Sequence, residues 1–176
     1  GIALPALATS ADGQFNAGLT QVFGEIGYGM EFQEMAIEPF AGLAWAHLNT
    51  DGFTETSAAA GLTGESQSSD VGYGTLGIRI AKDFAMQGGS VLTPRAALAW
   101  QYAFGDLSPG TTLSFAALGG SAFTASGVPL SENSALLDIG LDLQIGSSMT
   151  AGISYVGQFA SETRQNDVRG TLSWRF

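Results

Sequence analysis

One segment of this 176-residue chain matches a nucleotide-binding motif. Gly72-Tyr73-Gly74-Thr75-Leu76-Gly77 matches G-x-G-x-x-G, which cradles a dinucleotide only where a strand precedes it and a helix follows. The next residues, Ile78-Arg79-Ile80-Ala81, keep alternating apolar with polar positions, which is typical of a strand that continues. We therefore predict no dinucleotide site and no cofactor, and we attribute the glycines to crowding on a strand.

The residues that could support acid–base or nucleophilic catalysis are few. His47 is the only histidine, so a Ser-His-Asp site would have to use it, and we interpret it instead as an interfacial residue. Glu25 with Glu38, and Asp138 with Asp142, are the carboxylates that come nearest to an acid–base pair. Strand residues four positions apart lie about 13 Å from each other, too far to act together on one atom. The sequence predicts no enzyme.

Metal and nucleic-acid chemistry is equally poorly supported. The loop Asn49 to Glu55 has oxygen-bearing side chains at a calcium-like spacing but lacks the twelve-residue series of ligands, so no metal site is predicted. The absence of cysteine excludes thiol nucleophiles, zinc ribbons and disulfides. A net charge of −10 with six Lys and Arg residues argues against a nucleic-acid partner, because phosphates require clustered positive charge.

The dominant pattern in the chain is alternation with a period of two, which predicts strands with one apolar and one polar face. It is clearest at the C-terminus, where Val168, Gly170, Leu172, Trp174 and Phe176 alternate with Asp167, Arg169, Thr171, Ser173 and Arg175. Six further segments of about ten residues, the length that spans a bilayer at a tilt, alternate in the same way. They are residues 21–30, 35–45, 72–80, 92–104, 137–145 and 151–159.

The connections between these segments alternate between short and long. Short turns are predicted at residues 31–34, 82–90 and 146–148, and polar connections at 49–69, 105–134 and 161–166. The longer ones leave room for extra strands at residues 53–64, 111–118 and 123–130. Pro39 and Pro94 are interpreted as lying near strand starts, where a missing N–H is tolerated. Short periplasmic turns and longer external loops are typical of outer-membrane barrels.

Aromatic residues lie at the ends of the apolar stripes, as in an interfacial girdle. One girdle would contain Trp45, Trp100, Tyr102, Phe104 and Phe159, and the opposite one Trp174 and Phe176. Only 12 % of the residues are charged, yet no apolar run reaches the 18 residues of a membrane helix. These features predict an all-β fold, a transmembrane antiparallel up-and-down β-barrel, because closing the sheet removes unpaired edges from the lipid.

Seven segments, in chain order, resemble the C-terminal translocator domain of bacterial autotransporters, the proteins of type V secretion. They are Gln21 to Tyr28, Glu38 to Trp45, Asp51 to Glu55, Thr75 to Arg79, Pro94 to Trp100, Ala122 to Leu130, and the final Phe176. The resemblance implies a twelve-stranded barrel in the bacterial outer membrane, with a helix threaded through its pore and a passenger upstream. It implies that residues 1–176 form a β-barrel domain that is N-terminally incomplete, with seven or so C-terminal strands and without that helix.

The resemblance also implies partners and site residues. The expected partners are outer-membrane lipid, the outer-membrane assembly machinery, and the protein's own passenger and linker helix. Trp174 and Phe176 would serve as the assembly signal. The polar face carries charges of both signs on successive strands, which predicts a polar lumen tied together by ion pairs. The lumen-facing residues are predicted to be Glu25, Glu38, Arg79, Arg95, Asp138, Asp142, Arg169 and Arg175. Glu38, Arg79, Arg95 and Asp142 are predicted to form one band near the short turns.

Two other hypotheses stay open at this point. The chain could be a small complete outer-membrane barrel that binds ligands or adheres through its loops, with an eighth strand from residues 1–7. Alternatively, it could be an enzyme in a soluble β-sandwich, in which the apolar stripes are buried against each other.

Overall fold

The computed structural model describes residues 2–4, 9–11, 14–55, 61–116, 121–161 and 163–175. They separate into two compact units. The first comprises Gly1–Val22, Trp45–Gly72 and Phe104–Leu130, and the second Phe23–Ala44, Tyr73–Ala103 and Ser131–Phe176. The regular secondary structure in the described part of the chain consists entirely of β-strands. Within those same ranges, no helix is both long enough and apolar enough to span a membrane.

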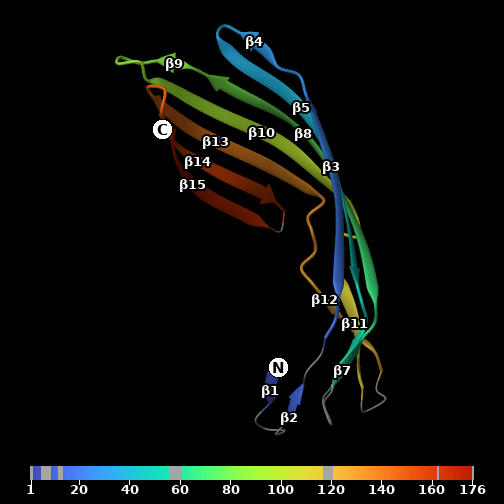
Figure 1. Cartoon of the computed structure of the whole chain (residues 1–176). Coiled ribbons are helices and arrows are strands. Elements are labelled where there is room, and N and C mark those ends of the chain that lie inside the picture. The colour runs from blue at the N-terminus through green and yellow to red at the C-terminus, as the bar shows by residue number, and fades with distance from the viewer. Residues whose placement is uncertain are drawn as a thin grey trace. The chain divides into compact units, whose positions relative to one another are not determined.

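Seven long strands follow one another in a single sheet in the order β15-β14-β13-β10-β8-β5-β3, as Figure 1 shows. This confirms the predicted number of long strands. Their bounds are β3 Ala17–Gly27, β5 Met35–Thr50, β8 Gln67–Lys82, β10 Val91–Gly105, β13 Asn133–Ile145, β14 Met149–Ala160 and β15 Arg164–Trp174. Two short strands, β4 (Met30–Phe32) and β9 (Phe84–Ala85), pair with β5 and β10.

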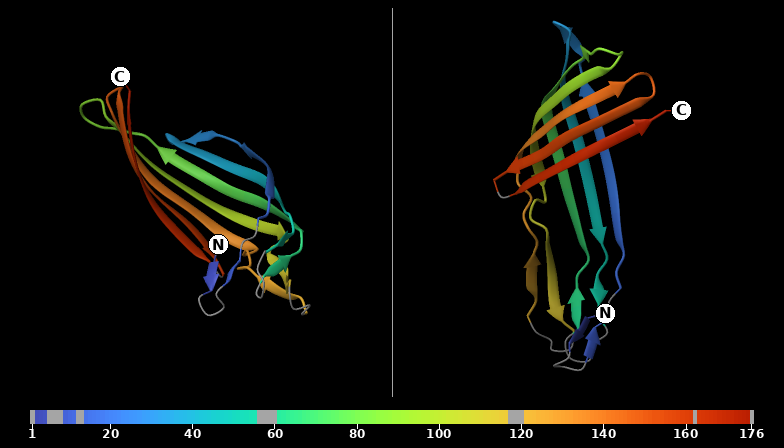
Figure 2. Two further views of the ribbon diagram at one scale, coloured as in Figure 1. Left: turned by 60° about the horizontal axis from the view of Figure 1, so that its bottom comes forward. Right: turned by 90° about the vertical axis from the view of Figure 1, so that its left-hand side faces the viewer.

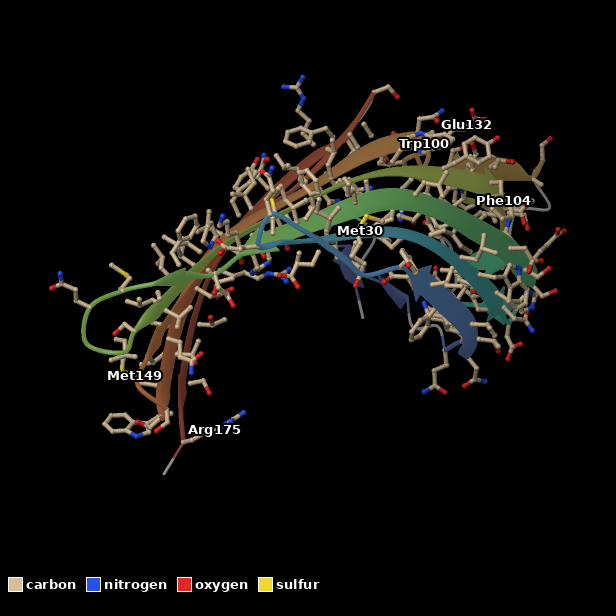
Figure 3. The ribbon with its side chains drawn as sticks, turned by 90° about the horizontal axis from the view of Figure 1, so that it is seen from above. Met30, Trp100, Phe104, Glu132, Met149 and Arg175 are labelled. Carbon is tan, nitrogen blue, oxygen red and sulfur yellow. The ribbon has the colours of Figure 1, made fainter. Side chains whose placement is uncertain are left out.

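The pairing register places the predicted polar faces of the last four strands on the same side of the sheet. Arg95 pairs with Gly140, Asp142 with Gly152, and Gly152 with Thr171, and residues paired across strands share a face. Strands β13, β14 and β15 lie side by side, and a tight turn at residues 146–148 joins β13 to β14 (Figure 2). The sheet of the second unit is curled, with Trp100 on its convex side and Arg175 pointing to its concave side (Figure 3).

Burial in the second unit is inverted relative to a soluble domain. The buried hydrophobic residues of the described chain are Ala99 and Ala103, which occupy the polar face. On the apolar face, Leu98, Ile153 and Val168 are 56 %, 58 % and 68 % exposed. A soluble sandwich would cover such a face with a second layer. The stripes are not buried against each other, so the β-sandwich hypothesis is wrong.

The first unit contains the extra strands predicted for the long connections. Strands β6 (Phe53–Thr54), β7 (Leu62–Gly64), β11 (Gly110–Phe115) and β12 (Phe123–Ser126) form a sheet in the order β12-β11-β7-β6. Strand β1 (Ile2–Leu4) pairs with β2 (Thr9–Ala11) in a separate two-stranded sheet. The eighth strand that the small-barrel hypothesis required from residues 1–7 therefore does not join the main sheet in the described part of that segment.

Two of the predicted connections are shorter in the structure, and Pro39 lies further inside its strand than predicted. The turn predicted at residues 31–34 narrows to Gln33 and Glu34, because Glu31 and Phe32 pair with β5. The connection predicted at 161–166 is shorter, since β15 begins at Arg164 and pairs from there with β14. Pro39 lies inside β5, opposite the interruption between β3 and β4, where its carbonyl still accepts a hydrogen bond of 3.0 Å from the Tyr28 N–H.

Candidate functional site

The first charged cluster joins three neighbouring strands around Arg79 of β8. Its Nη1 and Nη2 each lie 2.8 Å from a carboxylate oxygen of Glu25 on β3, and its Nη1 also lies 2.7 Å from Glu38 Oε1 on β5. The Phe40 ring lies beneath the guanidinium, 3.7 Å from Cζ to the ring centroid. The two-pronged contact with Glu25 is the strong geometry for an Arg–carboxylate pair, and a cation over an aromatic face adds to it.

The second cluster joins β10 to β13 around Arg95. Its Nη1 lies 2.8 Å from Asp138 Oδ1 and its Nε 2.9 Å from Asp142 Oδ2. Gly140 stands between the two aspartates, and a Cβ there would lie 2.7 Å from Arg95 Cζ. The guanidinium therefore lies flat over Gly140, and the glycine leaves the space that lets one arginine reach both carboxylates.

A hollow of about 590 Å³ is bordered by residues of both clusters. Glu38 and Arg79 line it from one cluster and Arg95 and Asp138 from the other, and between them stand small residues such as Ala81. Six of the eight residues predicted to face a lumen thus gather in two clusters of four carboxylates and two guanidinium groups. Of the four residues predicted to form one band, Glu38 and Arg79 belong to the first cluster, and Arg95 and Asp142 belong to the second.

The other two predicted residues lie apart from these clusters. Arg169 pairs with Asp167 of its own strand at 2.7 Å, and both side chains are more than half exposed, so the pair is a weak one. Arg175 donates its backbone N–H to the Ser148 carbonyl at 2.8 Å. Trp174 pairs with Met149 and is 70 % exposed, whereas Phe176 lies outside the described residues.

Glycines and a phenylalanine complete the charged face, and sequence reasoning had not assigned them this role. A Cβ on Gly77 would lie 2.5 Å from the Phe40 ring, so this glycine makes room for the ring that supports Arg79. Gly152 lies between Asp142 and Thr171, and a side chain there would displace both. The atoms that crowd these glycines belong to residues on neighbouring strands. The sequence of a single strand therefore shows only that glycines occur on its polar face.

The segment that matched G-x-G-x-x-G lies wholly inside β8, which confirms the prediction that it forms a strand. The strand continues beyond this segment to Lys82. Two of its glycines are covered by aromatic rings: Gly72 by Phe104 in the first unit, and Gly77 by Phe40 in the second. Packing therefore explains these glycines, as the sequence had suggested.

His47 belongs to the first unit and has a partner that sequence reasoning missed. Its Nδ1 lies 3.0 Å from Asp70 Oδ1, and its ring stacks on Trp45 with 5.8 Å between centroids. Asp70 also donates its backbone N–H to Asp106 Oδ2 at 2.8 Å. The histidine is therefore part of a hydrogen-bonded network that joins β5, β8 and the residue after β10. Across the described ranges, no three His, Cys, Asp or Glu residues are grouped to hold a metal ion.

Comparison with known proteins gives a family and two relatives. Residues 1–156 match the family described as "Autotransporter beta-domain". Two curated proteins of Serratia marcescens, both named "Extracellular serine protease", are 34 % identical over 163 residues and 35 % identical over 164 residues. Each alignment covers 93 % of this chain and 15 % of the relative, so the chain spans about a seventh of the length of these relatives.

Proposed function

The chain belongs to the autotransporter β-domains, which reside in the bacterial outer membrane, and we propose that its charged face lines the pore through which a passenger reaches the cell surface. A β-domain of this family is the non-catalytic translocator of type V secretion. The observation that carries the proposal is the opposition of two faces on one sheet. One holds the clusters around Arg79 and Arg95, and the other exposes Leu98, Ile153 and Val168.

The two faces suit two different solvents. Exposed aliphatic side chains are stabilised by contact with hydrocarbon, while charged groups in a bilayer face the interior of the protein or a water-filled cavity. Our proposal therefore assigns Glu25, Glu38, Arg79, Arg95, Asp138, Asp142, Arg169 and Arg175 to the lumen. Paired charges there would keep the wall hydrated and fix its register, and the four carboxylates and four guanidinium groups would give the wall charges of both signs.

The edges of the sheet support a larger barrel. Strands β3 and β15 are the ends of the seven-stranded path, so each has one edge without a partner strand in that path. An unpaired edge in hydrocarbon costs several kcal/mol for each open N–H or C=O group. We therefore propose that further strands of the parent protein pair with both edges and close the barrel around the linker helix of the passenger.

The passenger itself is proposed from the relatives. Both are named as extracellular serine proteases, and this chain aligns with a small part of each. We infer that the parent protein carries an extracellular serine protease as its passenger. Treating intact cells with a serine-directed active-site probe tests this inference. Labelling of a surface protein that is lost on deleting the parent gene supports it, and unchanged labelling contradicts it.

The end of β15 is proposed to be read by the outer-membrane assembly machinery. Trp174 is an exposed aromatic residue two positions before Phe176 in the sequence, and the family resemblance implies that this end is recognised. Deleting Phe176 from the intact parent protein should lower its outer-membrane yield, whereas deleting Gly1 should not. Equal yields at equal expression would remove the terminal aromatic residue from the proposal.

Translocation is tested by disturbing the wall of the pore. Arg79→Gln leaves Glu25 and Glu38 near each other without their shared cation. Lys82→Gln is the control, because its pair with Glu34 is longer, at 3.5 Å, and Glu34 is 86 % exposed. We expect Arg79→Gln to reduce passenger exposure on intact cells, measured by added protease, more than Lys82→Gln does. Equal exposure at equal barrel yield would contradict a role of this cluster in the pore.

A further inference from the structure

The apolar face of the second unit contains a groove of about 700 Å³ across β3, β5, β8 and β10. Its floor is made of small residues on adjacent strands, and a Cβ added to Gly24 would meet no atom within 4 Å. A Cβ on Gly74 would meet only Leu43 Cδ2, at 3.9 Å. The floor is therefore open space. The side chains that wall the groove are Ile26, Leu43, Leu76, Trp100 and Tyr102.

The groove has an aromatic border on β10 and an aliphatic border on β3, β5 and β8. The Trp100 indole N–H donates to Asn133 Oδ1 at 3.0 Å, and the Trp100 and Tyr102 rings lie 6.1 Å apart between centroids. Ile26 and Leu76 are aliphatic, 76 % and 56 % exposed. Tryptophan and tyrosine lie at the lipid–water boundary of membrane proteins, and aliphatic side chains lie deeper. The groove therefore has an aromatic border of the kind found at the lipid–water boundary, facing an aliphatic border of the kind that meets hydrocarbon.

We propose that this groove is a binding site for one acyl chain of the lipid in the outer leaflet, lipopolysaccharide. The groove is continuous with the lipid-facing surface of an outer-membrane domain, so hydrocarbon meets it. Trp100 and Tyr102 lie toward the long connection after β10, and long connections of such barrels are extracellular. The proposal rests on residence in the outer membrane and this orientation, and it does not require passenger export.

A second copy of the chain fits the groove less well. In a two-fold symmetric contact the same patch meets itself, so a hollow would face a hollow and stay unfilled. A flexible acyl chain can follow a narrow floor of Gly24, Ala41 and Gly74 and regain the dispersion contacts that an empty groove forgoes. Trp100, held by Asn133, gives the site a fixed wall on its aromatic border.

Native mass spectrometry of the intact parent protein, extracted in mild detergent from outer membranes, tests the proposal. Gly24→Leu and Gly74→Leu fill the floor, and Gly170→Leu is the control, because it adds the same side chain to open space on the same face of β15. We expect one retained lipopolysaccharide in the wild type and in Gly170→Leu, and roughly tenfold less in the floor variants. Equal retention in all proteins, or retention of phospholipid in place of lipopolysaccharide, would overturn the proposal.

A second measurement tests the proposal even if the floor variants assemble poorly. A photoreactive benzoylphenylalanine replaces Leu43 in the groove or, as a control, Ile139, which is on the same face of β13. We expect lipopolysaccharide adducts at position 43 to exceed those at position 139 about tenfold at equal illumination. Equal adducts at the two positions, or a protein–protein adduct at position 43, would contradict an acyl-chain site.

Discussion

Arg95 lies directly opposite Gly140 across the β10–β13 pair, and its guanidinium fills the space that a side chain at position 140 would occupy. From there it reaches Asp138 and Asp142, the diagonal neighbours on either side. The glycine is therefore a component of the ion cluster, although it carries no charge. This arrangement explains why an arginine and two carboxylates on neighbouring strands form one cluster without a distortion of the sheet.

Gly140→Ala should destabilise the folded domain. The added Cβ would lie 2.7 Å from Arg95 Cζ, so the guanidinium must leave at least one aspartate. Overpacking of this kind costs about 1–3 kcal/mol. Gly170→Ala is the control, with no atom within 4 Å of the new Cβ. Unfolding in urea, followed by the gel mobility of the folded form, measures both, and equal midpoints would show that Arg95 does not depend on the glycine.

Leu141→Arg should be much more harmful than Asp142→Asn. Leu141 lies on the apolar face and pairs with Ile153, and an arginine at the bilayer midplane costs about 2–4 kcal/mol. Asp142→Asn weakens one contact of a partly exposed pair, and Asp138 still holds Arg95, so about 1 kcal/mol or less is expected. Folding yield into lipid vesicles checks the order. The reverse order would mean that β13 faces the other way, which a shift of one residue produces.

Gln33→Gly should stabilise the turn between β4 and β5. Gln33 and Glu34 have φ angles of 48° and 61°, which glycine adopts without a Cβ penalty. Relief of the left-handed conformation, about 1–2 kcal/mol, exceeds the extra entropy that glycine loses, about 0.5–1 kcal/mol, so a higher urea midpoint is expected. Gln165→Gly, inside β15, is the control and should lower the midpoint, because glycine weakens a strand. A lower midpoint for Gln33→Gly would show that the turn relaxes in the membrane.

The seven long strands are predictable from sequence because alternation is a local property of each strand. The ends of these strands are harder to predict. Strand β8 begins at Gln67, five residues before the predicted start, because Ser68 to Asp70 pair in the sheet although they carry no apolar stripe. Strand β15 likewise begins in the polar residues Arg164 to Asn166. Outside the apolar stripe, pairing of backbone groups decides where a strand ends, and composition does not reveal it.

The charged residues of the site are predictable from the polar face, but their partners are not. Arg95 joins residues 43 and 47 positions away, and the choice depends on the register of β10 with β13. Arg169 pairs with Asp167 on its own strand, and the support of Arg79 by Phe40 appears only once β5 and β8 lie side by side. His47 and Asp70, 23 residues apart, were missed for the same reason.

The central claim, that one face of this sheet meets water in a pore and the other meets lipid, is tested most directly by cysteine labelling. The chain has no cysteine, so single substitutions report without background. Thr93→Cys and Gln101→Cys lie on the charged face, and Leu98→Cys and Ile153→Cys on the apolar face. With the parent protein in lipid vesicles, a charged water-soluble maleimide should label the first pair and leave the second unlabelled until detergent is added. Labelling of Leu98→Cys and Ile153→Cys with protection of Thr93→Cys and Gln101→Cys would contradict the account.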